Sequence, residues 1–148
     1  VTGDTFDEVM SNLALSLQDA RRYEEAEREY RAALAVRPDL HLAQHNLGVC
    51  LKAMGRPDEA EAAYRAALAL QPGDARTILN LGNLAYSRGR VQSAVDWYRK
   101  AAEAVPSNPE PHRLLGKIAF EAGRLKEADH EFAEYERLGG ALSLTAPR

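Results

Sequence analysis

Apolar residues recur along the chain at the spacing of α-helices. Two successive sets of four follow the i, i+3, i+4, i+7 pattern that gathers side chains on one face of a helix. The sets are Leu47, Cys50, Leu51 and Met54, and then Ala60, Ala63, Tyr64 and Ala67. Polar residues occupy most of the intervening positions. The pattern therefore predicts two amphipathic helices joined by a short turn.

The same pair of helices is predicted four times, because the pattern recurs at a constant interval. We call this interval, which separates Leu13 from Leu47, the repeat period. Four columns of related residues carry this period: a leucine, a small residue, an alanine and an aromatic residue. They are Leu13, Leu47, Leu81 and Leu115; Ala14, Gly48, Gly82 and Gly116; Ala26, Ala60, Ala94 and Ala128; and Tyr30, Tyr64, Tyr98 and Phe132. The period divides the chain into repeat 1 (7–40), repeat 2 (41–74), repeat 3 (75–108) and repeat 4 (109–142).

Turn and cap residues fall where this division needs them. Glycine separates the two helices of repeats 2 to 4, where a left-handed backbone is easiest for glycine, and Arg21 takes that place in repeat 1. Three prolines end second helices, since proline lacks the amide donor. Asp74 and Asn108 are predicted to cap the helices that follow them. The glycines are Gly55, Gly89 and Gly123, and the prolines are Pro38, Pro72 and Pro106.

These columns, with a second alanine at Ala33, Ala67 and Ala101, resemble the tetratricopeptide repeat (TPR) family. The resemblance covers about nine tenths of the chain. It implies an all-α fold, a right-handed α-solenoid of four helix-turn-helix repeats. We expect one repeat domain over residues 1–142 and a frayed tail over 143–148.

The two ends of the repeat array differ from its middle. The second helix of repeat 4, expected over 125–138, is rich in charged residues, which suits a self-capped end and favours a monomer. In the first helix, Val9, Met10, Leu13 and Leu17 are predicted to face inward. Ser16 stands where later repeats place apolar residues, which favours a true beginning of the array, with further repeats upstream as the alternative.

Composition excludes several classes of function. The net charge of −3 and the pI near 5.8 give no overall attraction for nucleic acid or anionic membranes. The lone Cys50 precludes an internal disulfide and, with no signal-like N-terminus or membrane-length apolar run, suggests a cytoplasmic protein. His41 and His45 have helical spacing but no third metal ligand nearby, so we expect no metal and no cofactor. No catalytic motif is present, and we expect a non-enzyme.

In a stack of helical hairpins, the first helices line the concave side. One asparagine per repeat, Asn12, Asn46 and Asn80, lies at the same position there, and Leu114 breaks the column in repeat 4. An asparagine amide both donates and accepts hydrogen bonds, so a ladder of them suits an extended peptide backbone. This column resembles the repeat domain of O-linked N-acetylglucosamine transferase, which implies peptide binding. The alternative is that the asparagines bond neighbouring helix ends or water.

The predicted peptide site adds seven further residues of this face. They are His45, Lys52, Arg76, Asn83, Tyr86, Arg113 and Lys117. Basic side chains gather in the second half of the face, so the partner is expected to be a protein or peptide that can carry an acidic segment; solvated surface charges are the alternative. The two-carboxylate clamp of chaperone-binding relatives is only partly present, because Ser11, Leu15 and Asn80 depart from it. A self-assembling scaffold and an accessory domain of a larger enzyme are the alternative functions.

Overall fold

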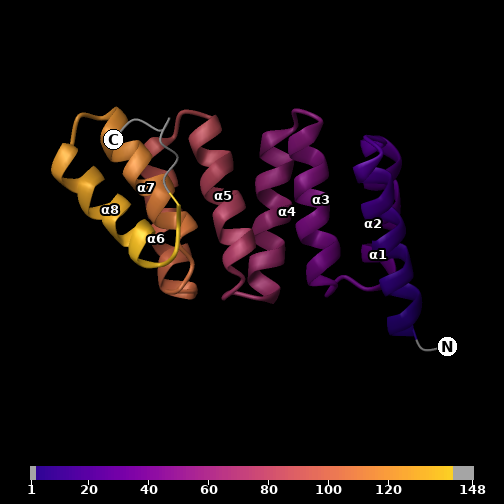
Figure 1. Cartoon of the computed structure of the whole chain (residues 1–148). Helices are drawn as coiled ribbons and strands as arrows, with labels where there is room; N and C mark the ends of the chain where they lie inside the picture. Colours follow the sequence, from indigo (N-terminus) through magenta and orange to yellow (C-terminus); the bar gives the residue numbers. More distant parts are fainter. Residues whose placement is uncertain (1–2, 142–148) are drawn as a thin grey trace. The chain divides into compact units, whose positions relative to one another are not determined.

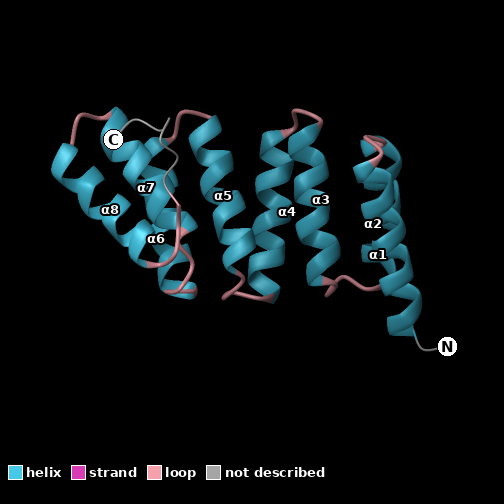
Figure 2. Cartoon of the chain, in the orientation of Figure 1, coloured by secondary structure: helices cyan, strands magenta, loops and turns pink. Residues whose placement is uncertain are grey.

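The computed structural model describes residues 3–141, which form helices joined by short turns and contain no strand (Figures 1 and 2). The first four helices are α1 (Gly3–Asp19), α2 (Tyr23–Val36), α3 (His41–Ala53) and α4 (Pro57–Leu70). The last four are α5 (Ala75–Ser87), α6 (Val91–Ala104), α7 (Glu110–Glu121) and α8 (Leu125–Arg137). The tail expected at 143–148 lies outside the described residues.

Each helix pair forms a hairpin whose inside is built from the small and aromatic columns. A Cβ added to Gly48 would lie 2.6 Å from the ring of Tyr64, and one added to Gly82 would lie 2.6 Å from Tyr98. Repeat 4 repeats this contact, with 2.7 Å between such an atom at Gly116 and the ring of Phe132. The small residue thus gives the aromatic ring room to pack flat against the facing helix.

The turns also follow the prediction. Gly55, Gly89 and Gly123 have φ between 73° and 76°, and Arg21 adopts φ 59° at the corresponding place. Asp74 caps α5 by accepting hydrogen bonds from the amide of Arg76 and the hydroxyl of Thr77, and Asn108 accepts one from the amide of Glu110 at 3.1 Å. The prolines lie shortly past the ends of α2, α4 and α6.

The chain divides into two compact units: unit 1 (residues 1–73) holds α1 to α4, and unit 2 (residues 74–148) holds α5 to α8. In each unit the second helix of one hairpin packs against the first helix of the next. These contacts are α2 against α3 in unit 1 and α6 against α7 in unit 2. We call them the α2–α3 seam and the α6–α7 seam.

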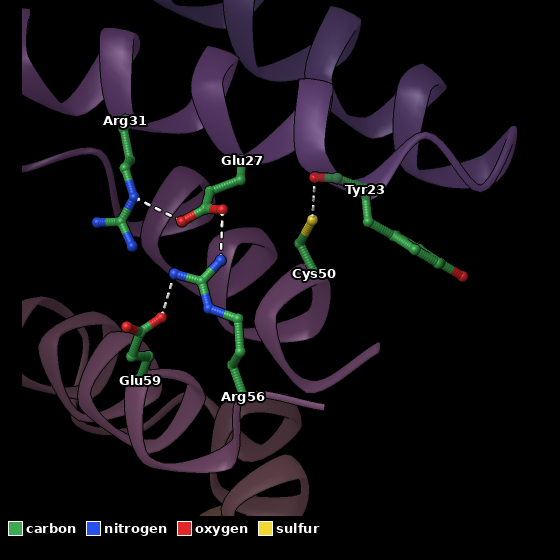
Figure 3. A network of polar contacts seen from close by, with 6 residues as sticks. All are labelled: Tyr23, Glu27, Arg31, Cys50, Arg56 and Glu59. Atoms are coloured by element: carbon green, nitrogen blue, oxygen red, sulfur yellow. Dashed lines mark hydrogen bonds and ion pairs between the residues drawn. The ribbon is translucent and has the colours of Figure 1, made fainter. Parts of the chain in front are cut away.

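The α2–α3 seam is ionic (Figure 3). The Glu27 carboxylate accepts hydrogen bonds from Arg56 at 2.6 Å and from Arg31 at 2.9 Å, and Arg56 also pairs with Glu59. The side chain of Glu27 is only 14% exposed, and the hydrogen bond from Arg56 lowers its pKa. Beside it, the Cys50 thiol donates to the Tyr23 carbonyl at 2.9 Å.

The α6–α7 seam is apolar at the same repeat positions. Val95 stands two repeat periods after Glu27 and is buried in a cluster with Tyr98, Leu115 and Ile118. Arg124 stands two repeat periods after Arg56 and pairs with Glu127 at 3.1 Å, as Arg56 pairs with Glu59. The two seams therefore share their geometry but differ in chemistry.

The inward face predicted for α1 needs correction. Val9 is 58% and Leu13 is 48% exposed, whereas Met10 and Leu17 are half-buried. Buried side chains come instead from Asp7, Ser11 and Ala14, at helical spacing; the Asp7 carboxylate lies 3.3 Å from the guanidinium of Arg37. Leu47 is covered in a seam with a preceding helix, and among the described residues no helix stands at the corresponding place beside Leu13.

No described helix is both long and apolar enough to cross a lipid bilayer.

Candidate functional site

A small pocket opens in unit 2 among α5, α6 and α7, and we call it the α5–α7 pocket. Its volume is about 190 Å³, and its wall is mostly apolar. It is lined by Asn83, Tyr86, Tyr98, Leu114, Lys117 and Ile118. Three of these residues, Asn83, Tyr86 and Lys117, belong to the predicted peptide site.

Polar groups of the pocket are held in fixed positions. The Tyr98 hydroxyl donates to the amide oxygen of Asn83 at 2.6 Å, and the Tyr86 hydroxyl donates to the Glu121 carboxylate at 2.6 Å. The exposed Lys117 ammonium lies 5.3 Å from the centroid of the Tyr86 ring, within range of a cation–π interaction. Because Tyr98 uses the amide oxygen of Asn83, the amide NH₂ is the end of that side chain suited to donating to a ligand.

Both pocket tyrosines remain neutral at physiological pH. Burial raises the pKa of Tyr98 to about 12, and the hydrogen bond to Glu121 raises the pKa of Tyr86. On α7, Arg113 donates to Glu110 at 3.0 Å, and this bond raises the pKa of Arg113 further. Lys117 is therefore the cation that projects from the pocket, while Arg113 is partly neutralised by its neighbour.

In unit 1, polar side chains occupy the place that corresponds to the α5–α7 pocket. Tyr30 stands two repeat periods before Tyr98, and its pKa is raised above its usual range, mainly by burial. Asn46 stands two repeat periods before Leu114, is only 6% exposed and hydrogen-bonds to Tyr30. The Tyr30 hydroxyl also donates to Gln18 at 3.4 Å. An asparagine therefore occupies in unit 1 the position at which Leu114 lines a pocket in unit 2.

The predicted site residues do not all lie on the surface. Asn12, Lys52, Arg76 and Lys117 are exposed, and Asn80, Asn83, Tyr86 and Arg113 are half-buried. His45 and Asn46 are buried, at 3% and 6% exposure, whereas the sequence predicts both on the concave binding face. His45 packs against Tyr64, with ring centroids 5.8 Å apart. The asparagine column is thus not equally available along the chain.

Three residues that line the pocket, Tyr98, Leu114 and Ile118, are not among the predicted site residues. Tyr98 belongs to the aromatic column, and Leu114 stands on the concave face where it breaks the asparagine column. Ile118 is one of the apolar residues that later repeats place at the position of Ser16. The sequence signal for the pocket is the leucine in the asparagine column. A leucine at this position gives the pocket an apolar wall, where an asparagine could have bonded to the nearby tyrosine hydroxyl.

The residues best suited to catalysis or metal binding are instead engaged in contacts within the fold. The Cys50 thiol is buried, and burial raises its pKa to about 11, so it is not an activated nucleophile. His41 donates through Nδ1 to the Ala67 carbonyl at 3.0 Å, which ties α3 to α4. Within residues 3–141, no three potential metal ligands from His, Cys, Asp and Glu converge.

Comparisons with known proteins agree with this helical-hairpin class. Two tetratricopeptide repeat models match residues 6–73 and 51–109. The chain belongs to the tetratricopeptide repeat family, and its all-α solenoid class is that of its structural neighbours. TPR domains generally act as non-catalytic protein-interaction modules.

Solved structures with this fold include MamA from Desulfovibrio magneticus RS-1, with TM-score 0.78 and 22% identity over 89% of this chain and 75% of that one. PilF from Pseudomonas aeruginosa has TM-score 0.80 and 25% identity over 93% of this chain and 63% of that one. An O-GlcNAc transferase mutant from Thermobaculum terrenum has TM-score 0.72 and 26% identity over 80% of this chain and 23% of that one. No curated protein sequence matches significantly.

Proposed function

We propose that this chain is a non-catalytic module that binds an extended peptide or protein segment along its first helices, with the α5–α7 pocket as the anchor point. The observation that carries the proposal is the pocket itself, an apolar hollow with an amide at its wall and the Lys117 ammonium at its surface. Family membership supports the general role, since protein interaction is the common function of TPR domains.

The size of the pocket favours one partner side chain rather than a whole small molecule. Its volume of about 190 Å³ is below the roughly 300–1,000 Å³ typical of small-molecule sites. Leu114 and Ile118 offer apolar contact to an aliphatic side chain that enters it. The Asn83 amide would donate to the backbone carbonyl of the same segment.

The positive charges of unit 2 favour a partner that carries an acidic residue near the side chain inserted in the pocket. Lys117 projects beside the pocket, and Arg76 is exposed on α5, where its guanidinium lies 4.0 Å from the Asp74 carboxylate. A partner carboxylate close to the inserted apolar residue would pair with Lys117. Glu110 and Glu121 lie on the same helix as Lys117 and would disfavour a run of acidic residues there, so a single nearby carboxylate fits best.

The test is selection of peptides from a random displayed library on the full chain, followed by direct titration of a selected peptide by fluorescence polarisation. Leu114→Asn, which copies Asn46 of unit 1 into the pocket, should weaken binding about tenfold or more. Lys117→Glu should weaken binding most at low salt, because added ions screen the lost attraction.

Lys126→Glu is the matched control, since Lys126 is also an exposed lysine of unit 2 but lies on the second helix α8, outside the predicted peptide site. It should leave the affinity of the selected peptide unchanged. Equal affinity of the wild type and Leu114→Asn, with the helical circular dichroism signal intact, would place peptide binding elsewhere.

A second candidate function is a helical-repeat segment of a larger enzyme. It is favoured by the match to the O-GlcNAc transferase, of which this chain covers only 23%. The length of the protein in its source cells, read by intact mass or immunoblotting, tests it. A product no longer than the 148 residues of this chain would exclude it.

A further inference from the structure

Two opposite charges stand one helical turn apart on α7, beside the α5–α7 pocket. They are Lys117 and Glu121, both exposed, and we call them the α7 charge pair. Residues four apart in an α-helix share a face and are separated by roughly 6 Å along its axis. The other first helices carry no opposite charges at these two positions, which are Leu15 and Asp19, Val49 and Ala53, and Asn83 and Ser87.

Tyr86 of α5 keeps the two charges apart. Its hydroxyl donates to Oε2 of Glu121 at 2.6 Å, and the Lys117 ammonium lies 5.3 Å from the centroid of its ring. A lysine and a glutamate at this spacing could pair with each other, although the order with lysine first is the weaker one. Within residues 3–141, no ion pair joins Lys117 to Glu121. Each charge is therefore held at Tyr86 and is not cancelled by the other.

Both charges of the pair can still bind a partner. A carboxylate accepts hydrogen bonds at both oxygens, so the bond from Tyr86 to Oε2 of Glu121 leaves Oε1 for a ligand. The Lys117 ammonium carries three N–H donors. Further along α7, Arg113 donates to Glu110 at 3.0 Å, so those two charges largely satisfy each other. The α7 charge pair thus offers one acidic and one basic contact side by side.

This arrangement matches an extended chain that carries both charges. We propose that the segment bound at the α5–α7 pocket has an acidic and a basic residue two positions apart, the acid on Lys117 and the base on Glu121. In an extended strand, residues two apart point to the same face and lie roughly 6.4–6.8 Å apart, close to the separation of positions 117 and 121. The inference rests on the proposed function, since the pocket supplies the aliphatic anchor of the same segment.

The order of residues on α7 also fixes the order of contacts. Leu114, which lines the pocket, precedes Lys117, and Glu121 follows it. The acidic residue of the partner therefore lies nearer the anchor than the basic residue does. A second acidic residue in place of the basic one would meet Glu121 and be repelled. Attraction at one position and repulsion at the next together give specificity for one sequence of charges.

The test repeats the selection from a random displayed peptide library on the full chain and on two variants. Peptides selected on the wild type should share an aliphatic residue, an acidic residue and a basic residue two positions from the acid. Glu121→Gln should keep the first two preferences and lose the third. Glu121→Lys should replace the basic residue by a second acidic one. A wild-type selection with no basic preference, or a preference unchanged in Glu121→Lys, overturns the proposal.

Two controls separate this outcome from the proposed function itself. Glu103→Lys makes the same change of charge at an exposed site on α6 and should select the same peptides as the wild type. If Leu114→Asn weakens binding but the Glu121 variants select unchanged peptides, the pocket binds its partner without reading the charge order. Selected peptides whose affinity is insensitive to Leu114→Asn would overturn the proposed function, and this inference with it.

Fluorescence polarisation then tests Tyr86 as the positioning residue. A selected peptide should bind the wild type at least tenfold more tightly at low salt than the same peptide with its basic residue changed to glutamate. Tyr86→Phe keeps the ring but removes the hydroxyl, which frees Glu121 to turn toward Lys117, so the affinity ratio of the two peptides should fall. A merely structural role would weaken both peptides by the same factor, and an unchanged ratio would refute the positioning role of Tyr86.

Discussion

The α2–α3 and α6–α7 seams join equivalent helices, yet one rests on an ion pair and the other on apolar packing. Glu27 meets Arg56 in unit 1, whereas Val95 lies in an apolar cluster with Leu115 and Ile118 in unit 2. The leucine that faces the second helix, Leu47 or Leu115, is buried in both. The repeat period thus determines where neighbouring hairpins meet. The individual residues at the seam determine how strongly the hairpins are held together and whether that strength depends on pH and salt.

This difference has a physical consequence for the two units. A partly exposed ion pair contributes little to stability at neutral pH, and acid and salt weaken it. Burial of apolar surface involves no charge that acid could remove or salt could screen. Unit 2 also has an open pocket where unit 1 has a hydrogen-bonded asparagine. We therefore expect mutations at equivalent positions to have unequal effects.

The largest effect is expected from Leu115→Ala in the α6–α7 seam. Removing a buried leucine should cost about 2–5 kcal/mol, through lost apolar contact and the cavity left behind. Leu13→Ala is the matched control, since it changes the same column at an exposed position and should stay within about 0.5 kcal/mol of the wild type. Urea unfolding at low micromolar concentration measures both. Similar losses for the two variants would mean that Leu13 is covered in solution.

A smaller effect is expected where the units are alike, inside the hairpins. Gly48→Ala should cost about 1–3 kcal/mol, because the new methyl group would meet the ring of Tyr64 at 2.6 Å. Gly116→Ala should cost a similar amount against Phe132. Thermal unfolding of the two variants compares them, and a loss confined to one unit would show that the hairpins are not equivalently packed.

Much of this fold follows from the sequence because its signals are local and repeated. The turn glycines and the prolines each follow from a single residue type at a fixed period. Arg21 is placed in the turn by position alone, and it does adopt a left-handed backbone. Repetition turns weak individual preferences into one consistent assignment.

The candidate site is harder to predict, because it depends on contacts between neighbouring hairpins. Asn46 and Asn80 share a column, yet Asn46 is buried and interacts with Tyr30 of the preceding hairpin, whereas Asn80 is half-buried. Leu13 belongs to the same column as the buried Leu47 and Leu115, but its own exposure depends on what packs against α1. Helical periodicity gives the direction of a side chain and not the identity of its neighbour.

Breaking the ionic seam should have a modest, pH-dependent effect. Glu27→Gln keeps the shape of the side chain but removes its charge, and should cost about 1 kcal/mol near neutral pH. The pKa of Glu27 is below its usual value of 4.5 in the folded protein, so its contribution is complete above that pH and is lost as the pH falls through the lowered pKa. The difference in unfolding free energy between wild type and variant should therefore shrink below pH 4.5.

Val95→Ala supplies the comparison for that experiment. It weakens the equivalent position of the apolar seam without removing a titratable group, so its cost should not change over the same pH range. Denaturant unfolding at several pH values, with both variants measured against the wild type, separates the two seams. A pH-independent cost for Glu27→Gln would show that the charge of Glu27 does not stabilise the α2–α3 seam.

The smallest expected effect concerns the turns, where unit 1 also differs from unit 2. Arg21 holds φ 59° in the turn of the first hairpin of unit 1, whereas the turns of both hairpins of unit 2 have glycine. Relief of a left-handed backbone is worth roughly 1–2 kcal/mol, but glycine costs roughly 0.5–1 kcal/mol through the freedom it adds to the unfolded chain. Arg21→Gly should therefore stabilise the protein by about 0.5–1 kcal/mol, seen as a small rise in Tm. Gly89→Arg copies the turn of repeat 1 into unit 2 and should lower Tm by a comparable amount, because the same two terms act with opposite sign. If both substitutions lower Tm, Arg21 makes contacts in its own turn that outweigh its backbone strain, and the difference between the units is then one of side-chain interaction rather than of backbone conformation.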